Sequence, residues 1–313
     1  MVALKSVVLV IVGFVLLIKG ADFFVGGASG IAEKFKIPQM IIGLTIVAFG
    51  TSAPEAAISI SAALQGTTGI AIGNVLGSNL LNVLLILGLT ACIVPLHIQK
   101  SSLRFDIPFN LVISVVLLAM GFFLGKLNLA CGIILWVFMI FFMTKLLRDA
   151  KKGMAEAAEE EPTQTKNVFL LILYTLGGLA AVVWGSDITV DNAKIIASLL
   201  GMSDRLIGLT IVAFGTSLPE LITSVTAARK GNADIAVGNI LGSNVFNILF
   251  VLGTVALIQP VEFASAFLLD AVLCVASMVL LLVLCFKKQT LSRSGGAVML
   301  GCYAAYFVYL LVS

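Results

Sequence analysis

Charged residues are scarce in this sequence. They make up 11% of the 313 residues, whereas hydrophobic residues make up 60%; a soluble domain has about 25% charged and about 45–50% apolar residues. The chain has one histidine and five cysteines without a CxxC pair, which argues against a His/Cys zinc site and a histidine-based triad. The HExxH, GxSxG and P-loop motifs are absent as well. We therefore expect no enzyme, no cofactor and no nucleic-acid partner.

The hydrophobic residues lie in long continuous runs, and not in the alternating strands of about ten residues that build a membrane β-barrel. Windows of about 20 residues identify the runs that can cross a lipid bilayer as helices. The sequence thus predicts an all-α polytopic membrane protein with ten transmembrane helices. Their expected ranges are 4–30, 37–64, 69–95, 105–124, 127–148, 167–190, 205–227, 233–258, 264–286 and 295–312.

The chain repeats itself after 165 residues. The segment IGLTIVAFGTS occurs at 42–52 and again, without a mismatch, at 207–217, and GNVLGSN at 73–79 returns as GNILGSN at 238–244. Each copy has five predicted helices, so the second must enter the membrane in the opposite orientation, which is typical of secondary transporters. The expected organisation is a first five-helix repeat at 1–148, a linker at 149–166 and a second, inverted repeat at 167–313.

The distribution of Lys and Arg predicts how the chain sits in the membrane. With the N-terminus outside, most of these residues fall in cytoplasmic connections, as the positive-inside rule requires. Both termini are then outside and the 149–166 linker is cytoplasmic. The first apolar run also has the character of a signal peptide, but it has a counterpart deep inside the chain, so we expect a retained first helix.

Each repeat carries a proline and a glutamate inside an apolar run, in GTSAPE at 50–55 and GTSLPE at 215–220. Proline interrupts helical hydrogen bonding and frees backbone carbonyls, which in lipid must line a cavity or find another partner. Hard cations such as Na⁺ and Ca²⁺ take carboxylate, carbonyl and hydroxyl oxygens as ligands. The residues that supply the break and these oxygens are Thr51, Ser52, Pro54, Glu55, Thr216, Ser217, Pro219 and Glu220.

The second motif adds neutral oxygens. Asn74, Ser78 and Asn82 are spaced four apart and share one face of a helix. Asn239, Ser243 and Asn247 repeat this face. A simpler interpretation remains open for single residues, because proline is often only a kink, and Ser, Thr and Asn often only join helices. It does not suit the two glutamates, since an acid inside a membrane is functional by default.

The charge of the two glutamates suggests a mechanism. No Lys or Arg lies near either in the sequence, so protons or bound cations must compensate the carboxylates. One Ca²⁺ or two to three monovalent ions match a charge of −2, and a site filled by one set or the other is an antiporter site. A Ca²⁺/H⁺ exchanger, a passive channel and an intramembrane enzyme are the alternatives.

The two linked motifs in each half resemble the alpha-repeats of the cation/Ca²⁺ exchanger superfamily, and most closely those of prokaryotic sodium/calcium exchangers. The resemblance implies exchange of Na⁺ for Ca²⁺ by alternating access, with 3 Na⁺ for 1 Ca²⁺, in the inner (plasma) membrane of a prokaryote. It implies that the first and sixth helices slide over a core of the second, third, seventh and eighth. A monomer would suffice for transport.

The resemblance also assigns ligands. Glu55 and Glu220 would bind Ca²⁺ together with the carbonyls of Thr51 and Thr216. Asn82 and Asn247 would face each other in the middle of the site. Because potassium-dependent relatives carry Asp where this chain has Asn247, we expect no K⁺ dependence. The flanking Na⁺ sites would use Ala48, Thr51, Glu55 and Ser78 on one side, and Ala213, Thr216, Glu220 and Ser243 on the other.

Overall fold

The structure is a computed structural model that describes residues 2–156, 167–201 and 213–312. Almost all of these residues are helical. Within these ranges, eight helices are long and apolar enough to cross a membrane, or nine if the bent pair at 39–64 is counted as one span. The prediction of a helical polytopic membrane protein is confirmed. The predicted span at 205–227 lies partly outside the described residues, which resume at 213.

The first half of the chain begins with α1 (Val2–Lys34), a single helix of 33 residues. A segment at 39–64 that is broken at Ser52 and a segment at 68–93 with a π-helical middle follow it. The elements after α1 are α2 (Gln39–Ile42), η1 (Gly43–Val47), α3 (Ala48–Thr51), α4 (Ala53–Leu64), α5 (Thr68–Leu80), η2 (Leu81–Leu87), α6 (Gly88–Ile93), β1 (Leu96–His97), η3 (Ser102–Asp106), α7 (Ile107–Leu124), β2 (Lys126–Leu127) and α8 (Leu129–Glu156).

The described elements of the second half follow the order of the first half, without a counterpart of the π-helical segment η3 among them. It begins with α9 (Val168–Leu199), a helix of 32 residues. The described elements after α9 are α11 (Ala213–Thr216), α12 (Leu218–Arg229), α13 (Ala233–Val245), η5 (Phe246–Leu252), α14 (Gly253–Ile258), β3 (Val261–Glu262), α15 (Ala266–Phe286), β4 (Thr290–Leu291) and α16 (Arg293–Val312). The strands pair antiparallel between the halves, β1 with β4 and β2 with β3.

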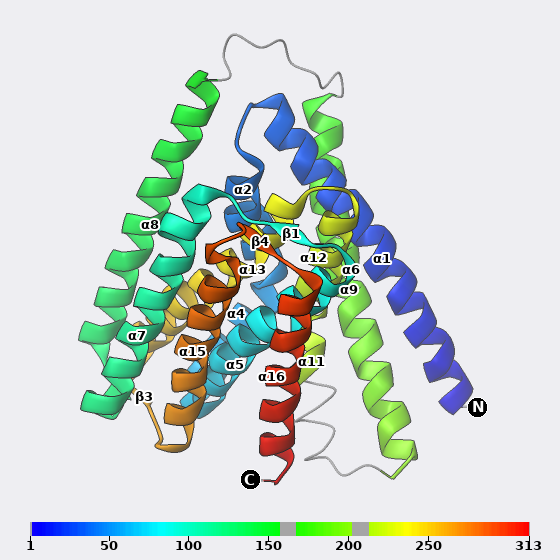
Figure 1. Cartoon of the computed structure of the whole chain (residues 1–313). Coiled ribbons are helices and arrows are strands. Elements are labelled where there is room, and N and C mark those ends of the chain that lie inside the picture. The colour runs from blue at the N-terminus through cyan, green and yellow to red at the C-terminus, as the bar shows by residue number, and fades with distance from the viewer. Residues whose placement is uncertain (1, 157–166, 202–212, 313) are drawn as a thin grey trace.

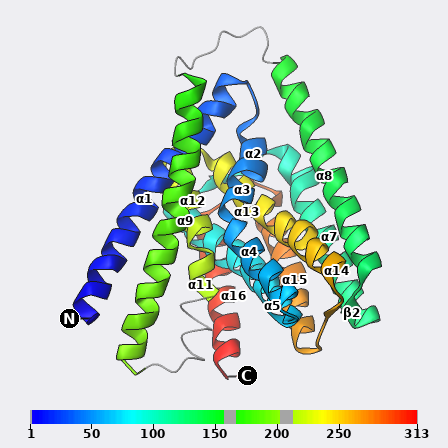
Figure 2. The ribbon, with the colours of Figure 1, turned by 180° about the vertical axis from the view of Figure 1, so that it is seen from behind.

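The two longest helices, α1 and α9, lie side by side and run in opposite directions (Figures 1 and 2). At 1.5 Å per residue each is about 50 Å long, so each must tilt in a hydrocarbon core of about 30 Å. Glycines let their backbones approach. A Cβ on Gly20 would lie 2.8 Å from the backbone nitrogen of Val182, and one on Gly178 only 2.3 Å from that of Phe24. Only glycine fits these two crossing points.

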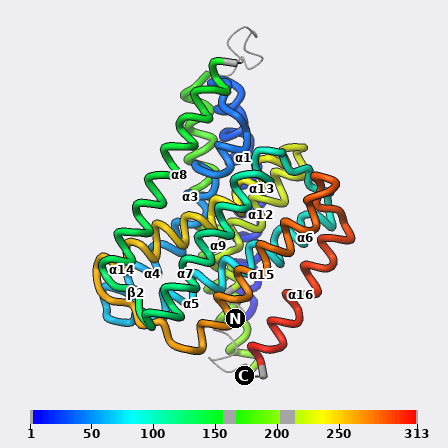
Figure 3. Tube along the Cα trace, turned by 60° about the vertical axis from the view of Figure 1, so that its left-hand side comes forward, coloured from blue at the N-terminus to red at the C-terminus, as the bar shows by residue number. Residues whose placement is uncertain are grey.

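The centre of the molecule is formed by α5 and α13 with their continuations. The most apolar 18-residue window is 83% buried in the span that starts with α13 and 72% buried in the span that starts with α5, against 28% in α1 and in α9. Figure 3 shows α12 and α13 in the middle of the trace, between α8 and α16. The GNVLGSN and GNILGSN motifs therefore fall on the most buried of the long apolar helices that the structure describes.

Several helices extend further than their hydropathy predicts. The fifth predicted helix ends at 148, but α8 continues to Glu156, with Lys145 and Asp149 forming an i,i+4 ion pair of 2.7 Å. The first part of the predicted linker is therefore helical, and 157–166 lie outside the described residues. Likewise, α9 continues past the predicted end at 190 to Leu199. A hydropathy window detects the membrane-embedded part of a helix and misses its polar end.

Candidate cation site

The GTSAPE segment breaks its helix. α3 ends at Thr51 and α4 begins at Ala53, with a bend of 49° between the two parts. Pro54 lies in the first turn of α4, where its missing N–H costs nothing. Glu55 consequently sits in the first turn of a new helix, where the helix dipole favours a carboxylate. The break does more than free carbonyls: it supplies a helix N-terminus beside the acid.

The GTSLPE segment has the same geometry. The backbone angles of Ser217 are φ −94° and ψ 7°, close to the −86° and 7° of Ser52. Pro219 and Glu220 occupy the first turn of α12. The two repeats thus present their glutamates at the starts of two half-helices.

The two glutamates are held by serines from the opposite repeat. Ser52 Oγ donates to Glu220 Oε1 at 2.7 Å, and Ser217 Oγ donates to Glu55 Oε1 at 3.4 Å. Each glutamate is 1% exposed. The structure therefore brings both motifs into one site, with each carboxylate reaching across to the other half of the chain.

The asparagines at the start of the second motif support the glutamate backbones. Asn74 Nδ2 donates to the carbonyl of Glu55 at 3.2 Å and to Ser59 Oγ at 2.9 Å. Asn239 Nδ2 repeats both bonds, to the carbonyl of Glu220 at 3.4 Å and to a serine hydroxyl at 2.9 Å. These amides therefore connect α5 to α4 and α13 to α12.

Hydroxyl groups join the two halves beside the break at Ser52. Thr51 Oγ1 lies 3.0 Å from Asn239 Oδ1 and 3.3 Å from the carbonyl of Ala48. Ser243 Oγ donates to the same carbonyl at 3.5 Å. Ser78, on α5, is also buried. Thr216 ends α11 and Ala213 begins it.

Four buried oxygens of the site accept no hydrogen bond from the residues that the structure describes. They are Glu55 Oε2, Glu220 Oε2, Asn82 Oδ1 and Asn247 Oδ1, two from each repeat in equivalent positions. A buried acceptor without a partner costs about 1–3 kcal/mol, and more if it is charged. In the described part of the chain, no Lys or Arg forms an ion pair with either glutamate. Four such oxygens are the ligands that a hard cation takes.

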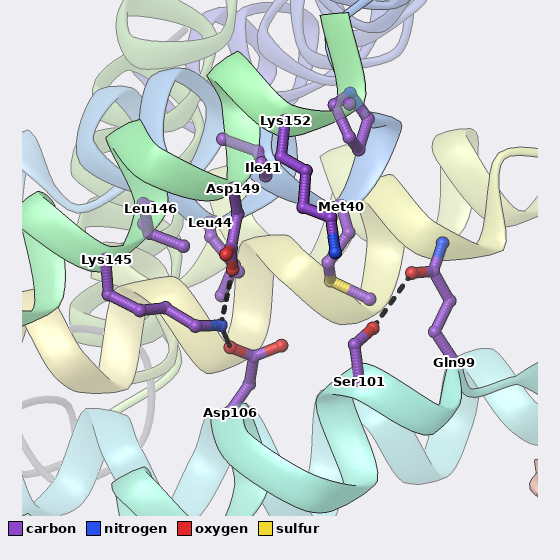
Figure 4. Close-up of a pocket in the computed structure, with 12 residues that line it drawn as sticks. Met40, Ile41, Leu44, Gln99, Ser101, Asp106, Lys145, Leu146, Asp149 and Lys152 are labelled. Atoms are coloured by element: carbon purple, nitrogen blue, oxygen red, sulfur yellow. Dashed lines mark hydrogen bonds and ion pairs between the residues drawn. The ribbon is translucent and has the colours of Figure 1, made fainter. Parts of the chain in front are cut away.

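A polar cavity of about 250 Å³ lies elsewhere, between α2, η3 and the end of α8 (Figure 4). Its charges balance, because two lysines, Lys145 and Lys152, and two carboxylates, Asp106 and Asp149, line it. Lys145 Nζ lies 2.7 Å from Asp149 Oδ2 and 3.8 Å from Asp106 Oδ1. None of the predicted site residues lines this cavity. The predicted site and this cavity are therefore separate.

Sequence reasoning missed the asparagines that end the second motif, Asn79 and Asn244. Both are 3% exposed, and both accept hydrogen bonds from site residues of the other repeat. The repetition of GSN in both copies contained the signal. The signal was overlooked because Asn79 and Asn244 lie three positions before Asn82 and Asn247, and so fall outside the series of polar residues spaced four apart.

The fold and this site define a polytopic membrane transporter for inorganic cations. The profile of the sodium/calcium exchanger protein family matches residues 5–147 and again residues 170–312. The chain belongs to this family, and its two matches coincide with the two halves described above.

Relatives and solved structures agree with this assignment. The chain is 34% identical to the sodium/calcium exchanger MaX1 of Methanosarcina acetivorans, over 96% of this chain and 97% of that protein. It is 37% identical to the inner membrane protein YrbG of Escherichia coli, over 95% and 94%. The fold is similar to that of the sodium-calcium exchanger NCX_Mj, with a TM-score of 0.86, 30% identity, and coverage of 98% and 99%.

Proposed function

We propose that this protein is a secondary antiporter that exchanges Na⁺ for Ca²⁺ by alternating access. The observation that carries the proposal is the set of four unpartnered buried oxygens, two of them carboxylate, contributed equally by the two repeats. Bound cations would satisfy these oxygens without a basic side chain. The names of MaX1 and NCX_Mj, both sodium/calcium exchangers, support Na⁺ and Ca²⁺ as these cations.

The ligands are proposed as follows. Ca²⁺ binds between Glu55 and Glu220, with the carbonyls of Thr51 and Thr216, and Asn82 and Asn247 face the middle of the site. Ser52 and Ser217 orient the carboxylates through the cross-repeat bonds. The Na⁺ sites use Ala48, Thr51, Glu55 and Ser78 in the first half and Ala213, Thr216, Glu220 and Ser243 in the second.

We infer a stoichiometry of 3 Na⁺ for 1 Ca²⁺. Two carboxylates match one Ca²⁺, whereas three Na⁺ exceed them by one charge, so exchange of 3 Na⁺ for 1 Ca²⁺ moves one net charge per cycle. That charge couples transport to the membrane potential at about 2.3 kcal/mol per 100 mV. With Na⁺ entering and Ca²⁺ leaving, the protein extrudes Ca²⁺ from a prokaryotic cell.

We place the protein in the inner membrane, as ten helices in two inverted repeats (1–148 and 167–313) joined by the 149–166 linker. α1 begins and α16 ends on one side of the molecule, and α8 ends and α9 begins on the other (Figure 1). This arrangement supports termini on one side of the membrane and the linker on the other, and the positive-inside rule makes the side of the linker cytoplasmic. One chain contributes both carboxylates, so a monomer is sufficient.

Alternating access is proposed to use α1 and α9 as the moving pair. Their contact contains backbone approaches that only glycine allows, so the two helices can shift as one closely packed pair. Both helices border the site: α1 contacts α12, and Ser186 of α9 donates to the carbonyl of Gly215 at 2.9 Å.

Proteoliposomes test the coupling ion. We expect an outward Na⁺ gradient to drive ⁴⁵Ca²⁺ uptake, and external K⁺ to have no effect. The alternative, a Ca²⁺/H⁺ exchanger that protonates the same two glutamates, is tested by a pH gradient without Na⁺. Uptake driven by the pH gradient and indifferent to Na⁺ would overturn the proposal.

A further inference from the structure

Two pairs of asparagines cross between the repeats next to the site. Asn82 Nδ2 donates to Asn244 Oδ1, and Asn247 Nδ2 donates to Asn79 Oδ1, both at 3.1 Å. All four side chains are at most 3% exposed. Asn82 and Asn247 are each the second residue of a π-helical segment, η2 and η5. These segments contact α12 and α4, the helices that begin beside Glu220 and Glu55.

An asparagine side chain has two ends of nearly equal size and opposite character. Its oxygen accepts hydrogen bonds and can bind a cation, whereas its NH₂ group only donates and would repel one. Which end faces the site depends on what holds the other end. In both Asn82 and Asn247 the NH₂ group is bonded to the opposite repeat, and the oxygen accepts no hydrogen bond within the described ranges.

The orientation of the Asn79–Asn247 pair is fixed by a backbone group that can only accept a hydrogen bond. Asn79 Nδ2 donates to the backbone carbonyl of Asn244 at 3.4 Å, and a carbonyl can only accept. This bond orients the Asn79 amide so that its oxygen accepts from Asn247. The Asn247 oxygen is then left for the site. A backbone carbonyl of α13 thus sets the polarity of a side chain in η5 through an intermediate on α5.

We propose that Asn79 and Asn244 are positioning residues for transport: they hold the amides of Asn247 and Asn82 with their oxygens toward the cation. The inference rests on the proposed function of the site. It adds two residues that do not touch the ion and explains why the GSN triplet occurs in both motifs. Each repeat thereby controls the polarity of a ligand in the other.

The competing hypothesis is that Asn79 and Asn244 only join α5 to α13. The two roles differ in the quantity that a substitution changes. A joining role affects the folding stability of the ion-free protein, whereas a positioning role affects cation affinity, and only while the positioned amide is present.

The test is a set of double-mutant cycles read as the apparent KM for Ca²⁺ in proteoliposomes. We expect Asn244→Ala to raise this KM about tenfold, the loss that one hydrogen bond or ligand contact gives, with kcat changed much less. In an Asn82→Ala background the same substitution should have almost no further effect. Asn79→Ala, whose partner is Asn247, should keep its full effect in that background and serves as the crossed control.

Wild-type protein is measured first, so failure of Na⁺-driven Ca²⁺ uptake would count against the proposed function, whereas normal uptake with additive cycles would overturn only the positioning role. Thermal unfolding of the ion-free variants reports folding. If Asn244→Ala does not fold, Asn244→Ser takes its place, because its shorter hydroxyl cannot reach Asn82. An equal loss from Asn244 substitution with and without Asn82 would refute the inference.

Discussion

The two repeats are nearly identical where they form the site and different where they meet the long helices. Each provides a serine, a glutamate, a supporting asparagine and an unpartnered amide oxygen, in the same order and with matching bonds. A cation that enters from either side therefore meets the same types of ligand. This is the property that a transporter with two alternating openings needs.

The flanks of the repeats are not equivalent. Lys230 at the end of α12 lies 3.2 Å from Asp22 Oδ1 of α1, and it also donates to the Asp22 carbonyl. With the 165-residue shift, the matching residues are Gln65 and Asp187. Gln65 instead donates to Ser61 at 3.2 Å, and Asp187 is exposed. The site is thus symmetric in its ligands, whereas its attachment to α1 and α9 is not.

The largest expected effect tests the symmetry of the site. Glu55→Gln and Glu220→Gln should each reduce Na⁺-driven ⁴⁵Ca²⁺ uptake at least about a hundredfold, because a unit charge a few ångströms from the ion is worth about 4 kcal/mol near a protein surface. Both variants should fold, since glutamine keeps the size and one acceptor. Glu262→Gln, at an exposed position on β3, is the control and should transport normally. A large loss from only one of the two buried positions would contradict the symmetry.

The second prediction concerns the close contact of α1 and α9. A Cβ at Gly178 would lie 2.3 Å from the backbone nitrogen of Phe24, whereas at the neighbouring Gly177 it would meet nothing within 4 Å. We expect Gly178→Ala to destabilise the protein by about 1–3 kcal/mol through overpacking and to slow exchange at least tenfold. Gly177→Ala should be neutral or slightly stabilising. Thermal unfolding and uptake rates compare the two, and equal behaviour would show that the contact is not tight.

Most residues of the site could be predicted from the sequence, because the two repeats carry the same residue types 165 positions apart. Pro54 and Glu55, with their counterparts, could be found from one chain, since an acid inside an apolar run is rare and functional by default. The break at Ser52 followed from proline chemistry. The identity of the transported ions, Na⁺ and Ca²⁺, came from the family resemblance.

The cross-repeat bonds could not be predicted. That Ser52 reaches Glu220 and not Glu55 depends on how α3 and α12 cross, and helix crossing is set by packing over many residues rather than by local pattern. For the same reason Asn79 and Asn244 were overlooked. The polar ends of α8 and α9 were missed because ion pairs and good helix formers extend them beyond the apolar window.

The third prediction uses the unequal serine bonds to measure how symmetric the site is. Ser52 Oγ lies 2.7 Å from the Glu220 carboxylate, a length typical of charge-assisted bonds. Ser217 Oγ lies 3.4 Å from the Glu55 carboxylate. Ser52→Ala should therefore raise the apparent KM for Ca²⁺ about tenfold and Ser217→Ala only about threefold. Side-by-side uptake measurements decide this. A larger loss from Ser217→Ala would mean that the two distances do not reflect binding strength.

The smallest expected effect concerns the attachment of α1. The Lys230–Asp22 pair is partly exposed, 36% and 42% at the side chains, and such pairs contribute about 0.2–1 kcal/mol. We expect the Lys230–Asp22 pair to favour one orientation of α1 against α12. Lys230→Gln should therefore lower the population of that orientation relative to the others by no more than about fivefold, and high ionic strength should shift the wild type in the same direction. Hydrogen–deuterium exchange of α1 and the end of α12 at low and high salt measures the shift. Gln65→Lys, at the equivalent position of the first repeat, is the matched control: in the described residues α4 has no contact with α9 comparable to that of α12 with α1, so this lysine should leave the exchange of α9 unchanged. If Lys230→Gln leaves the exchange of α1 unchanged at low salt, the unequal flanks have no bearing on which conformation the protein prefers.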